Sequence, residues 1–187
     1  MLPDQFTSQR GWEVDQTIPI NKNGVEKIVY PVRKKGVLCA AKIYRNTNSS
    51  SGDRVNKVKE SRHEFQSYLL TKRSSLENYI PAPFEMIQDD RGNDTGLLVE
   101  WKSGTELVEG YRRIYIPHAE ISILENILLN LPENIWLNAD SISESNVCWD
   151  GNQLWLAEPE LRKFSSSSIW ESVVKWQMKY FHENYCR

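Results

Sequence analysis

The sequence predicts an α+β protein, because strand-like and helix-like patterns occupy different parts of the 187-residue chain. Short runs rich in β-branched and aromatic residues, separated by turn-forming residues, are concentrated in the first half. In the second half, two helical patterns flank a short hairpin. This separation is typical of the α+β class and predicts two lobes that meet near residues 101–104.

Three strands are expected in succession near the N-terminus, at about 12–20, 27–33 and 37–44. β-branched and aromatic residues dominate these runs, as they do in strands. The turn signals at 21–24 and at Lys35-Gly36 are short, so each strand should pair antiparallel with the next. The polar loop 46–53 then supplies a serine or an aspartate to cap the following helix.

A helix is expected at about 54–73, where apolar side chains recur with a broken helical period. Its first half is charged, so that half should be exposed. The Pro-Ala-Pro sequence at 81–83 excludes a helix and begins an extended segment at 84–88. After a polar turn, the apolar run 96–101 predicts a buried strand.

Two further helices are expected in the second half. The pattern at 118–131 is the clearest, because its apolar residues follow the i, i+3, i+4, i+7 spacing of one helix face. Pro132 ends this helix. A serine-rich linker at 165–168 leads into a final helix, in which the apolar residues between 169 and 181 share a face.

Between these helices, an Asp-Gly pair at 150–151 predicts a hairpin with a two-residue turn, because Asp-Gly readily adopts the positive φ angles of that turn. Asp140 and Asn146 lie on the entering side of the hairpin, and Glu158 lies on the leaving side. Folding of the hairpin would bring these three oxygen-bearing side chains to one end. Carboxylate and amide oxygens suit Mg²⁺, so a magnesium and phosphate site is expected there.

Composition excludes several function classes. The formal charge of −2 gives no global basic field, and no run of basic residues is longer than 33–35, which disfavours nucleic-acid binding. The three cysteines are widely spaced, and with only three histidines the sequence suggests neither a disulfide framework nor a zinc site.

The sequence also predicts a soluble cytoplasmic protein that does not enter a membrane. Its N-terminus lacks the apolar core of a signal peptide, and no apolar run approaches ~18 residues. A bacterial protein that a specialised machine exports into a host cell would show the same pattern, because such export signals need not be apolar.

Several motifs follow one another at suitable distances. Ala40-Ala41-Lys42-Ile43 lies in the third expected strand, the helical segment 62–70 contains Glu64, and an apolar strand follows at 97–101. These motifs resemble the protein-kinase-like superfamily, including the aminoglycoside and lipopolysaccharide sugar kinases, over most of the chain. The resemblance implies that Lys42 binds the α- and β-phosphates of ATP and that Glu64 pairs with Lys42.

The same resemblance implies an adenine-binding hinge and a phosphate loop. Backbone groups around Glu100, Trp101 and Lys102 would hydrogen-bond the base. The segment 21–26 is similar to a thin glycine-rich loop in which Gly24 would contact the phosphates. Gly24 also has an ordinary interpretation as the turn residue of a hairpin.

Two motifs in the second half complete the resemblance. Asn138-Ala139-Asp140 is similar to the His-Gly-Asp or His-Arg-Asp of kinases, and 155–160 is similar to the strand that ends in Ile-Asp-Phe-Gly or Ile-Asp-Pro-Glu. By this match, Asp140 would orient the attacking hydroxyl and accept its proton. Asn146 and Glu158 would hold Mg²⁺.

The resemblance therefore implies an ATP- and Mg²⁺-dependent phosphotransferase formed by one kinase-like domain over 1–187. Its β-rich N-lobe would span about 12–101 and its reduced helical C-lobe about 102–187. Few residues follow Glu160, so the chain is similar to short bacterial effector-type kinases that lack the usual substrate-binding helices. A protein Ser/Thr hydroxyl is the favoured acceptor and a small molecule the other, and an activating protein partner is a further possibility.

Departures from the family pattern favour a second hypothesis, a pseudokinase that binds nucleotide or a protein partner without turnover. Asn138 replaces the catalytic-loop histidine, Glu158 replaces the metal-binding aspartate, and Asn146 lies one residue later than in the family. A third interpretation is an α+β domain that shares only this order of elements. Taken singly, Lys42 is an ordinary strand lysine, and Glu64 an ordinary helix residue.

Overall fold

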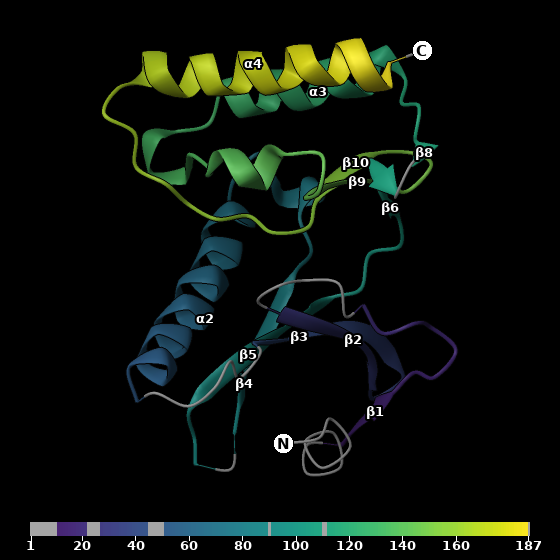
Figure 1. Cartoon of the computed structure of the whole chain (residues 1–187), viewed down its shortest axis with the longest axis vertical. Helices are drawn as coiled ribbons and strands as arrows, with labels where there is room; N and C mark the ends of the chain where they lie inside the picture. Colours follow the sequence, from purple (N-terminus) through teal and green to yellow (C-terminus); the bar gives the residue numbers. More distant parts are fainter. Residues whose placement is uncertain (1–10, 22–26, 45–50, 90, 110–111, 187) are drawn as a thin grey trace. The chain divides into compact units, whose positions relative to one another are not determined.

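The computed structural model describes residues 11–21, 27–44, 51–89, 91–109 and 112–186 (Figure 1). These residues form a five-stranded sheet, two smaller sheets and three α-helices, which confirms the predicted α+β class. The chain divides into two compact units, Met1–Gln66 with Ala82–Trp101 and Ser67–Pro81 with Lys102–Arg187. Within the described ranges, none of the helices combines the length and apolar character that a membrane-spanning segment needs.

The first unit is built on the five-stranded sheet, whose strands are β1 (Trp12–Val14), β2 (Lys27–Lys34), β3 (Val37–Tyr44), β4 (Pro83–Gln88) and β5 (Asp94–Glu100). The strand order is β1-β2-β3-β5-β4, and every neighbouring pair is antiparallel (Figure 1). A tight turn at Lys35 and Gly36, both with positive φ, joins β2 to β3. The order makes β3 the central strand.

Strand β1 is much shorter than the expected 12–20. The carboxylate of Asp15 accepts hydrogen bonds from the backbone N–H of Thr17, at 2.9 Å, and from its hydroxyl. Arg33 Nε also lies 2.8 Å from this carboxylate. An aspartate that bonds its own chain two residues later forms a turn, so the strand ends at Val14.

Helix α2 (Ser51–Thr71) follows β3 and covers most of the expected helix at 54–73. Its buried face, however, is largely polar: Ser61, Glu64, Ser67 and Thr71 are buried there together with Tyr68. The hydroxyl of Thr71 donates a hydrogen bond to the carbonyl of Ser67 at 2.7 Å. The small hydroxyl side chains explain why the apolar period of this helix is broken.

Gly96 in β5 lies against the backbone of β3. A Cβ atom at this position would be 2.2 Å from the carbonyl oxygen of Lys42 and 3.2 Å from the Cα of Ile43. We therefore expect Gly96→Ala to lower the free energy of unfolding by about 1–3 kcal/mol, the usual cost of overpacking, because backbone atoms must move. Urea unfolding measures the change, and Val37→Ala, at an exposed position of β3, should change it by less than about 0.5 kcal/mol. Equal effects of the two variants would contradict the prediction.

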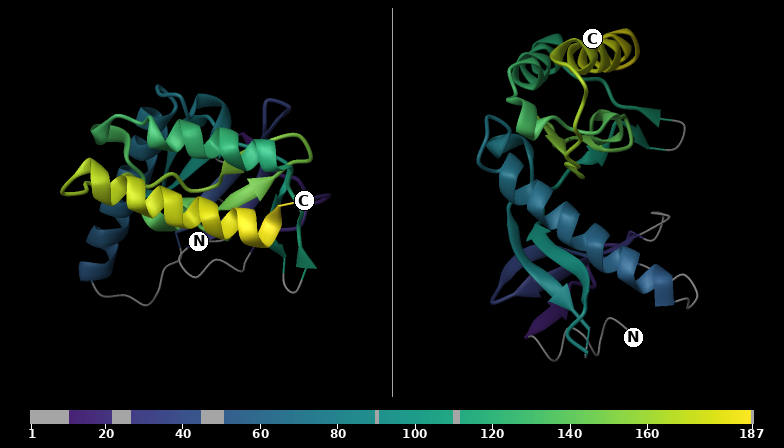
Figure 2. Two further views of the ribbon diagram at one scale, coloured as in Figure 1. Left: turned by 90° about the horizontal axis from the view of Figure 1, so that it is seen from above. Right: turned by 90° about the vertical axis from the view of Figure 1, so that its left-hand side faces the viewer.

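The second unit packs two long helices over small sheets and short 3₁₀ segments. Its elements are η1 (Glu77–Tyr79), β6 (Thr105–Glu106), β7 (Val108–Glu109), β8 (Arg112–Arg113), α3 (His118–Leu129), η2 (Glu133–Ile135), η3 (Ala139–Ile142), β9 (Val147–Trp149), β10 (Leu154–Leu156) and α4 (Ser167–Tyr185). Helices α3 and α4 lie side by side in both views of Figure 2, and both were expected from their apolar periods. Strands β10, β9 and β6 form one antiparallel sheet in that order.

The predicted two-residue hairpin turn is wrong. Trp149 pairs with Leu154, so the connection between β9 and β10 runs over residues 150–153. The carboxylate of Asp150 accepts hydrogen bonds from the N–H groups of Asn152 and Gln153, each at 2.8 Å. These bonds stabilise a longer loop, which the Asp-Gly pair alone does not reveal.

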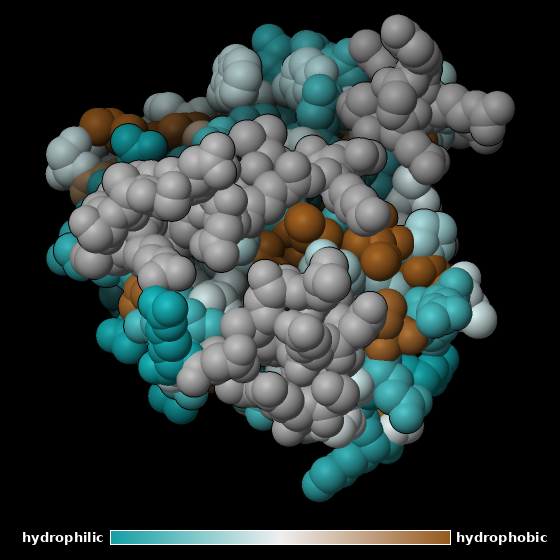
Figure 3. Space-filling model, turned by 60° about the horizontal axis from the view of Figure 1, so that its bottom comes forward, coloured by the Kyte–Doolittle hydropathy of each residue, from teal (hydrophilic) through white to brown (hydrophobic). Residues whose placement is uncertain are grey.

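Each unit has its own apolar core. In the first unit the sheet buries Trp12, Tyr30, Val32, Cys39, Ala41, Ile87 and Leu98. In the second unit the core joins α3, α4 and the hairpin, with Trp170, Val174, Met178, Phe181 and Tyr185 contributed by α4. Figure 3 colours one face by hydropathy, and a group of apolar residues is visible near its centre.

Candidate functional site

Lys42 and Glu64 form a buried ion pair in the first unit. Lys42 lies in the central strand β3, where it pairs with Val29 on one side and Leu97 on the other. Its Nζ is 3.4 Å from Oε1 of Glu64 on α2, and the two residues are only 5% and 6% exposed. The structure thus brings together the lysine and glutamate that the sequence motifs single out.

Two further side chains bind the same carboxylate, and the sequence analysis missed both. Lys27 Nζ lies 3.1 Å from Oε2 of Glu64, and the Tyr44 hydroxyl donates to that oxygen as well. The β2/β3 register sets Lys27 opposite Tyr44, and Tyr44 is two residues from Lys42, so they share a face of the sheet. This alternation along β3 is the signal that would have found Tyr44.

The cluster of Lys27, Lys42, Tyr44 and Glu64 carries two ammonium groups and one carboxylate. One carboxylate can accept several charge-assisted hydrogen bonds, which fixes the directions of both lysine side chains. The side chains of both lysines are at least 88% buried, because their relative exposures are 12% and 7%. The cluster therefore places two buried ammonium groups around one carboxylate.

Several groups of the expected hinge already form hydrogen bonds within the protein. The N–H of Glu100 already donates to the carbonyl of Ala82 at 2.8 Å, and its carboxylate accepts from the N–H of Ala82 at 3.0 Å. Lys102 Nζ donates to the carbonyl of Asn78 at 3.1 Å. Glu100 therefore joins Ala82 to the end of β5 through both its backbone and its side chain. Gly24, the expected phosphate-loop glycine, lies outside the described residues.

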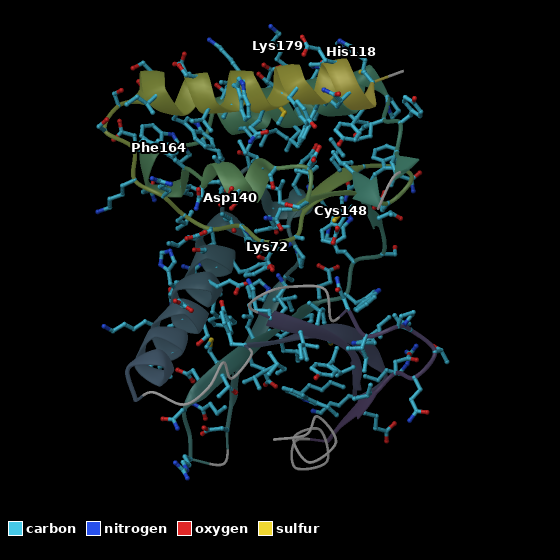
Figure 4. All side chains as sticks on the ribbon, in the orientation of Figure 1. Lys72, His118, Asp140, Cys148, Phe164 and Lys179 are labelled. Atoms are coloured by element: carbon cyan, nitrogen blue, oxygen red, sulfur yellow. The ribbon has the colours of Figure 1, made fainter. Side chains whose placement is uncertain are left out.

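Asp140, Asn146 and Glu158 belong to the second unit. Asp140 is exposed on η3, where Figure 4 labels it, and its carbonyl accepts a 2.9 Å hydrogen bond from Nδ2 of Asn146. The carbonyl of Asn146 in turn accepts from the N–H of Ala157 at 2.8 Å. Asn146 therefore bonds to the segment that leads directly into Glu158, which is half-buried.

The bond from Nδ2 orients the Asn146 side chain. Because the nitrogen is used on Asp140, the amide oxygen is the atom that remains for a ligand. No other described residue donates a hydrogen bond to it. Amide and carboxylate oxygens are ligands that Mg²⁺ accepts, together with water and phosphate oxygens. Asn146 and Glu158 thus offer oxygen atoms of the kind that Mg²⁺ accepts, and a magnesium site here stays a prediction.

Asn138 holds the loop of Asp140 in place. Its N–H donates to the carbonyl of Glu160 at 2.7 Å, and its Nδ2 donates to Oε2 of the same residue at 3.1 Å. The N–H of Glu160 donates to Oγ of Ser141 at 2.9 Å. Asn138 therefore has a structural role here. The sequence analysis did not identify its partner, Glu160.

A third cluster was also missed. The sequence suggested no zinc site, yet one candidate ligand atom from each of His118, His182 and Cys186 lies within 4.8 Å of the other two. His182 and Cys186 are four residues apart at the end of a helix, which puts them on one face. That spacing is a signal in the sequence, whereas the proximity of His118 is not.

The first two groups of side chains lie in different units and differ in their chemistry. Ammonium groups neutralise phosphate charge, and carboxylate and amide oxygens coordinate Mg²⁺. Comparison of the chain with protein-family models and with curated proteins finds no match.

Proposed function

We propose that this protein is an ATP- and Mg²⁺-dependent phosphotransferase with a two-lobed protein-kinase-like fold. The observation that carries the proposal is the buried pair of Lys42, on the central strand of an antiparallel sheet, and Glu64, on the helix that follows. The order of three strands, a helix and two strands is also the order that the family resemblance implies. Charge neutralisation and positioning are the main requirements of phosphoryl transfer.

Each residue has a distinct role in this proposal. Lys42 would bind the α- and β-phosphates, and Glu64 would hold its ammonium group in position. Asn146 and Glu158 would coordinate Mg²⁺ through their oxygens. Asp140, whose carboxylate is exposed, would orient the acceptor hydroxyl and accept its proton.

The proposed acceptor is a Ser or Thr hydroxyl of a protein. In the part of the chain that the structure describes, one long helix, α4, follows Glu160. A folded protein substrate brings its own docking surface, which a small molecule does not. A cytoplasmic location, in a bacterium or in a host cell, would supply ATP.

A specific observation favours a second candidate function, a nucleotide- or partner-binding pseudokinase. Asn138 has no titratable group, and its amide is bonded to Glu160. Glu158 carries one more methylene than aspartate, which moves the carboxylate by ~1.5 Å, and octahedral Mg²⁺ tolerates little misplacement. These two features would impair turnover without preventing nucleotide binding.

Nucleotide binding is the first test. ATP with Mg²⁺ is expected to raise the melting temperature of the full-length protein, because a ligand that binds only the folded state stabilises it. Lys42→Met should reduce this shift strongly, since Glu64 keeps Lys27 as a partner and the fold is retained. Lys59→Met, at an exposed position of α2, is the matched control and should keep the full shift. No shift with ATP and Mg²⁺ in the unmodified chain would reject both the kinase and the pseudokinase.

Phosphoryl transfer is the second test. Incubation with labelled ATP and candidate protein acceptors should label a protein, and Asp140→Asn should lower the rate by about 10²–10⁴-fold, the usual contribution of a general base. The variant should bind ATP as the unmodified protein does. Nucleotide binding without transfer to any acceptor would favour the pseudokinase, and transfer that persists in Asp140→Asn would exclude its role as the base.

A further inference from the structure

The cluster of His118, His182 and Cys186 lies where the start of α3 meets the end of α4. Figure 4 labels His118 at this end of the two helices. His118 is the first residue of α3, His182 lies in the last turn of α4, and Cys186 is the residue that follows this helix. The imidazole rings of the two histidines have centroids 4.3 Å apart.

The fold holds the cluster together through backbone bonds and buried side chains. The N–H of Ile116 donates to the carbonyl of Tyr185 at 2.7 Å, and Ile116 forms a parallel bridge with Cys186. Ile116, Phe181 and Tyr185 are completely buried. The three candidate ligands are therefore brought together by packing that does not itself need a metal ion.

One distance matches that of a tetrahedral zinc site. Cys186 Sγ lies 3.6 Å from Nδ1 of His182. With Zn–N bonds of about 2.0–2.1 Å and a Zn–S bond of about 2.3 Å, tetrahedral angles put the sulfur and nitrogen ligands roughly 3.6 Å apart. This pair therefore already has the separation of two ligands of one ion, and a ligand atom of His118 lies within 4.8 Å of both.

An oxygen atom lies near the second ring nitrogen of each histidine. Nδ1 of His118 lies at hydrogen-bond distance, 3.2 Å, from Oγ of Ser122, which leaves Nε2 for a ligand. Nε2 of His182 lies 3.9 Å from Oε2 of Glu125, beyond hydrogen-bond distance, and Nδ1 is the atom that faces Cys186. Histidines that bind metals commonly donate their other N–H to a carboxylate or another oxygen, which fixes the tautomer and the ring orientation.

We propose that His118, His182 and Cys186 bind one zinc ion, with Ser122 and Glu125 orienting the two imidazoles. The exposed position of His118 leaves the fourth coordination site to water. The ion would join the start of α3 to the end of α4 and so stabilise the second unit. This inference concerns residues that the proposed phosphotransferase does not use.

The test is metal binding by the full-length chain after its metals are removed with a chelator. One Zn²⁺ per chain is expected to bind and to raise the melting temperature. Co²⁺ should bind at the same site and give a thiolate-to-metal charge-transfer band together with the strong visible bands of tetrahedral coordination. Cys186→Ser should abolish the charge-transfer band.

Variants distinguish ligands from their supports. His182→Ala should lose more affinity than Glu125→Gln, for which a loss of about 10–100-fold is typical of an outer partner. His63→Ala is the matched control, since His63 is exposed on α2, and it should leave the stoichiometry and the affinity unchanged. Circular dichroism checks that each variant is folded.

Two results would overturn the proposal. One is a Zn²⁺ affinity of the unmodified chain no higher than that of a variant lacking all three ligands. The other is a Co²⁺ complex without a thiolate band, which needs no variant at all. Neither result bears on ATP binding by the first two groups of residues, so the failure of this inference is distinguishable from that of the phosphotransferase.

Discussion

Replacing Glu64 by alanine is expected to lower the free energy of unfolding by about 3–5 kcal/mol. The carboxylate accepts from Lys27, Lys42 and Tyr44, all of which are largely buried. Its removal takes away the acceptor that two buried ammonium groups share, and breaking a buried ion pair by removing one partner is strongly destabilising. Urea unfolding followed by circular dichroism measures the effect.

Two further variants separate the effect of the Glu64 charge on stability from the effect of its position in α2. Glu60→Ala, one helical turn earlier and exposed, should change the free energy of unfolding by less than about 0.5 kcal/mol. Glu64→Gln keeps an acceptor for Tyr44 but removes the charge, so its cost should lie between those of the two alanine variants. A stability of Glu64→Ala equal to that of Glu60→Ala would show that both lysines find other partners.

The second large effect is expected at Trp170, for which replacement by alanine should cost about 3–5 kcal/mol. This side chain is 1% exposed at the start of α4. Its ring lies 5.6 Å from that of Phe164 and 6.3 Å from that of Trp136, and its Nε1 donates to the carbonyl of Leu128 at 3.0 Å. Alanine would leave a cavity between α3 and α4 and remove one of the donors to the Leu128 carbonyl, which also accepts from the N–H of Leu131.

The same helix supplies the control. Trp176 is 66% exposed, so Trp176→Ala should change stability little, although the same kind of side chain is removed. Thermal unfolding of both variants under identical conditions provides the comparison. Equal melting temperatures for the two variants would mean that Trp170, at the start of α4, does not pack as described.

Apolar periodicity was sufficient for the helices of the second unit. The residues of α3 and α4 that face the core recur at helical spacing, and burying them is what makes these segments helical. The same approach located α2 but not its buried face, because Ser61, Ser67 and Thr71 replace apolar residues there. A polar residue on a buried face is explained only by its partner, and the partner lies elsewhere in the chain.

Turns were less predictable than helices. The Asp-Gly pair at 150–151 correctly marked the position of a hairpin, yet the carboxylate of Asp150 selects a longer loop through two backbone N–H groups. Asp15 likewise ends β1 earlier than its apolar pattern suggests. In both cases a local side-chain hydrogen bond competes with the strand ladder, and a pattern of apolar residues does not report that competition.

By itself, the sequence determined the α+β class and the positions of the principal strands and helices, because apolar patterns report local structure. The pairing of Lys42 with Glu64 was expected only from the family resemblance of its motifs. Only the tertiary structure added Lys27 and Tyr44 to that carboxylate, since strand register decides which side chains share a face. It also brought His118 to His182 and Cys186. Contacts between distant parts of a chain depend on register and packing, which local sequence patterns do not encode.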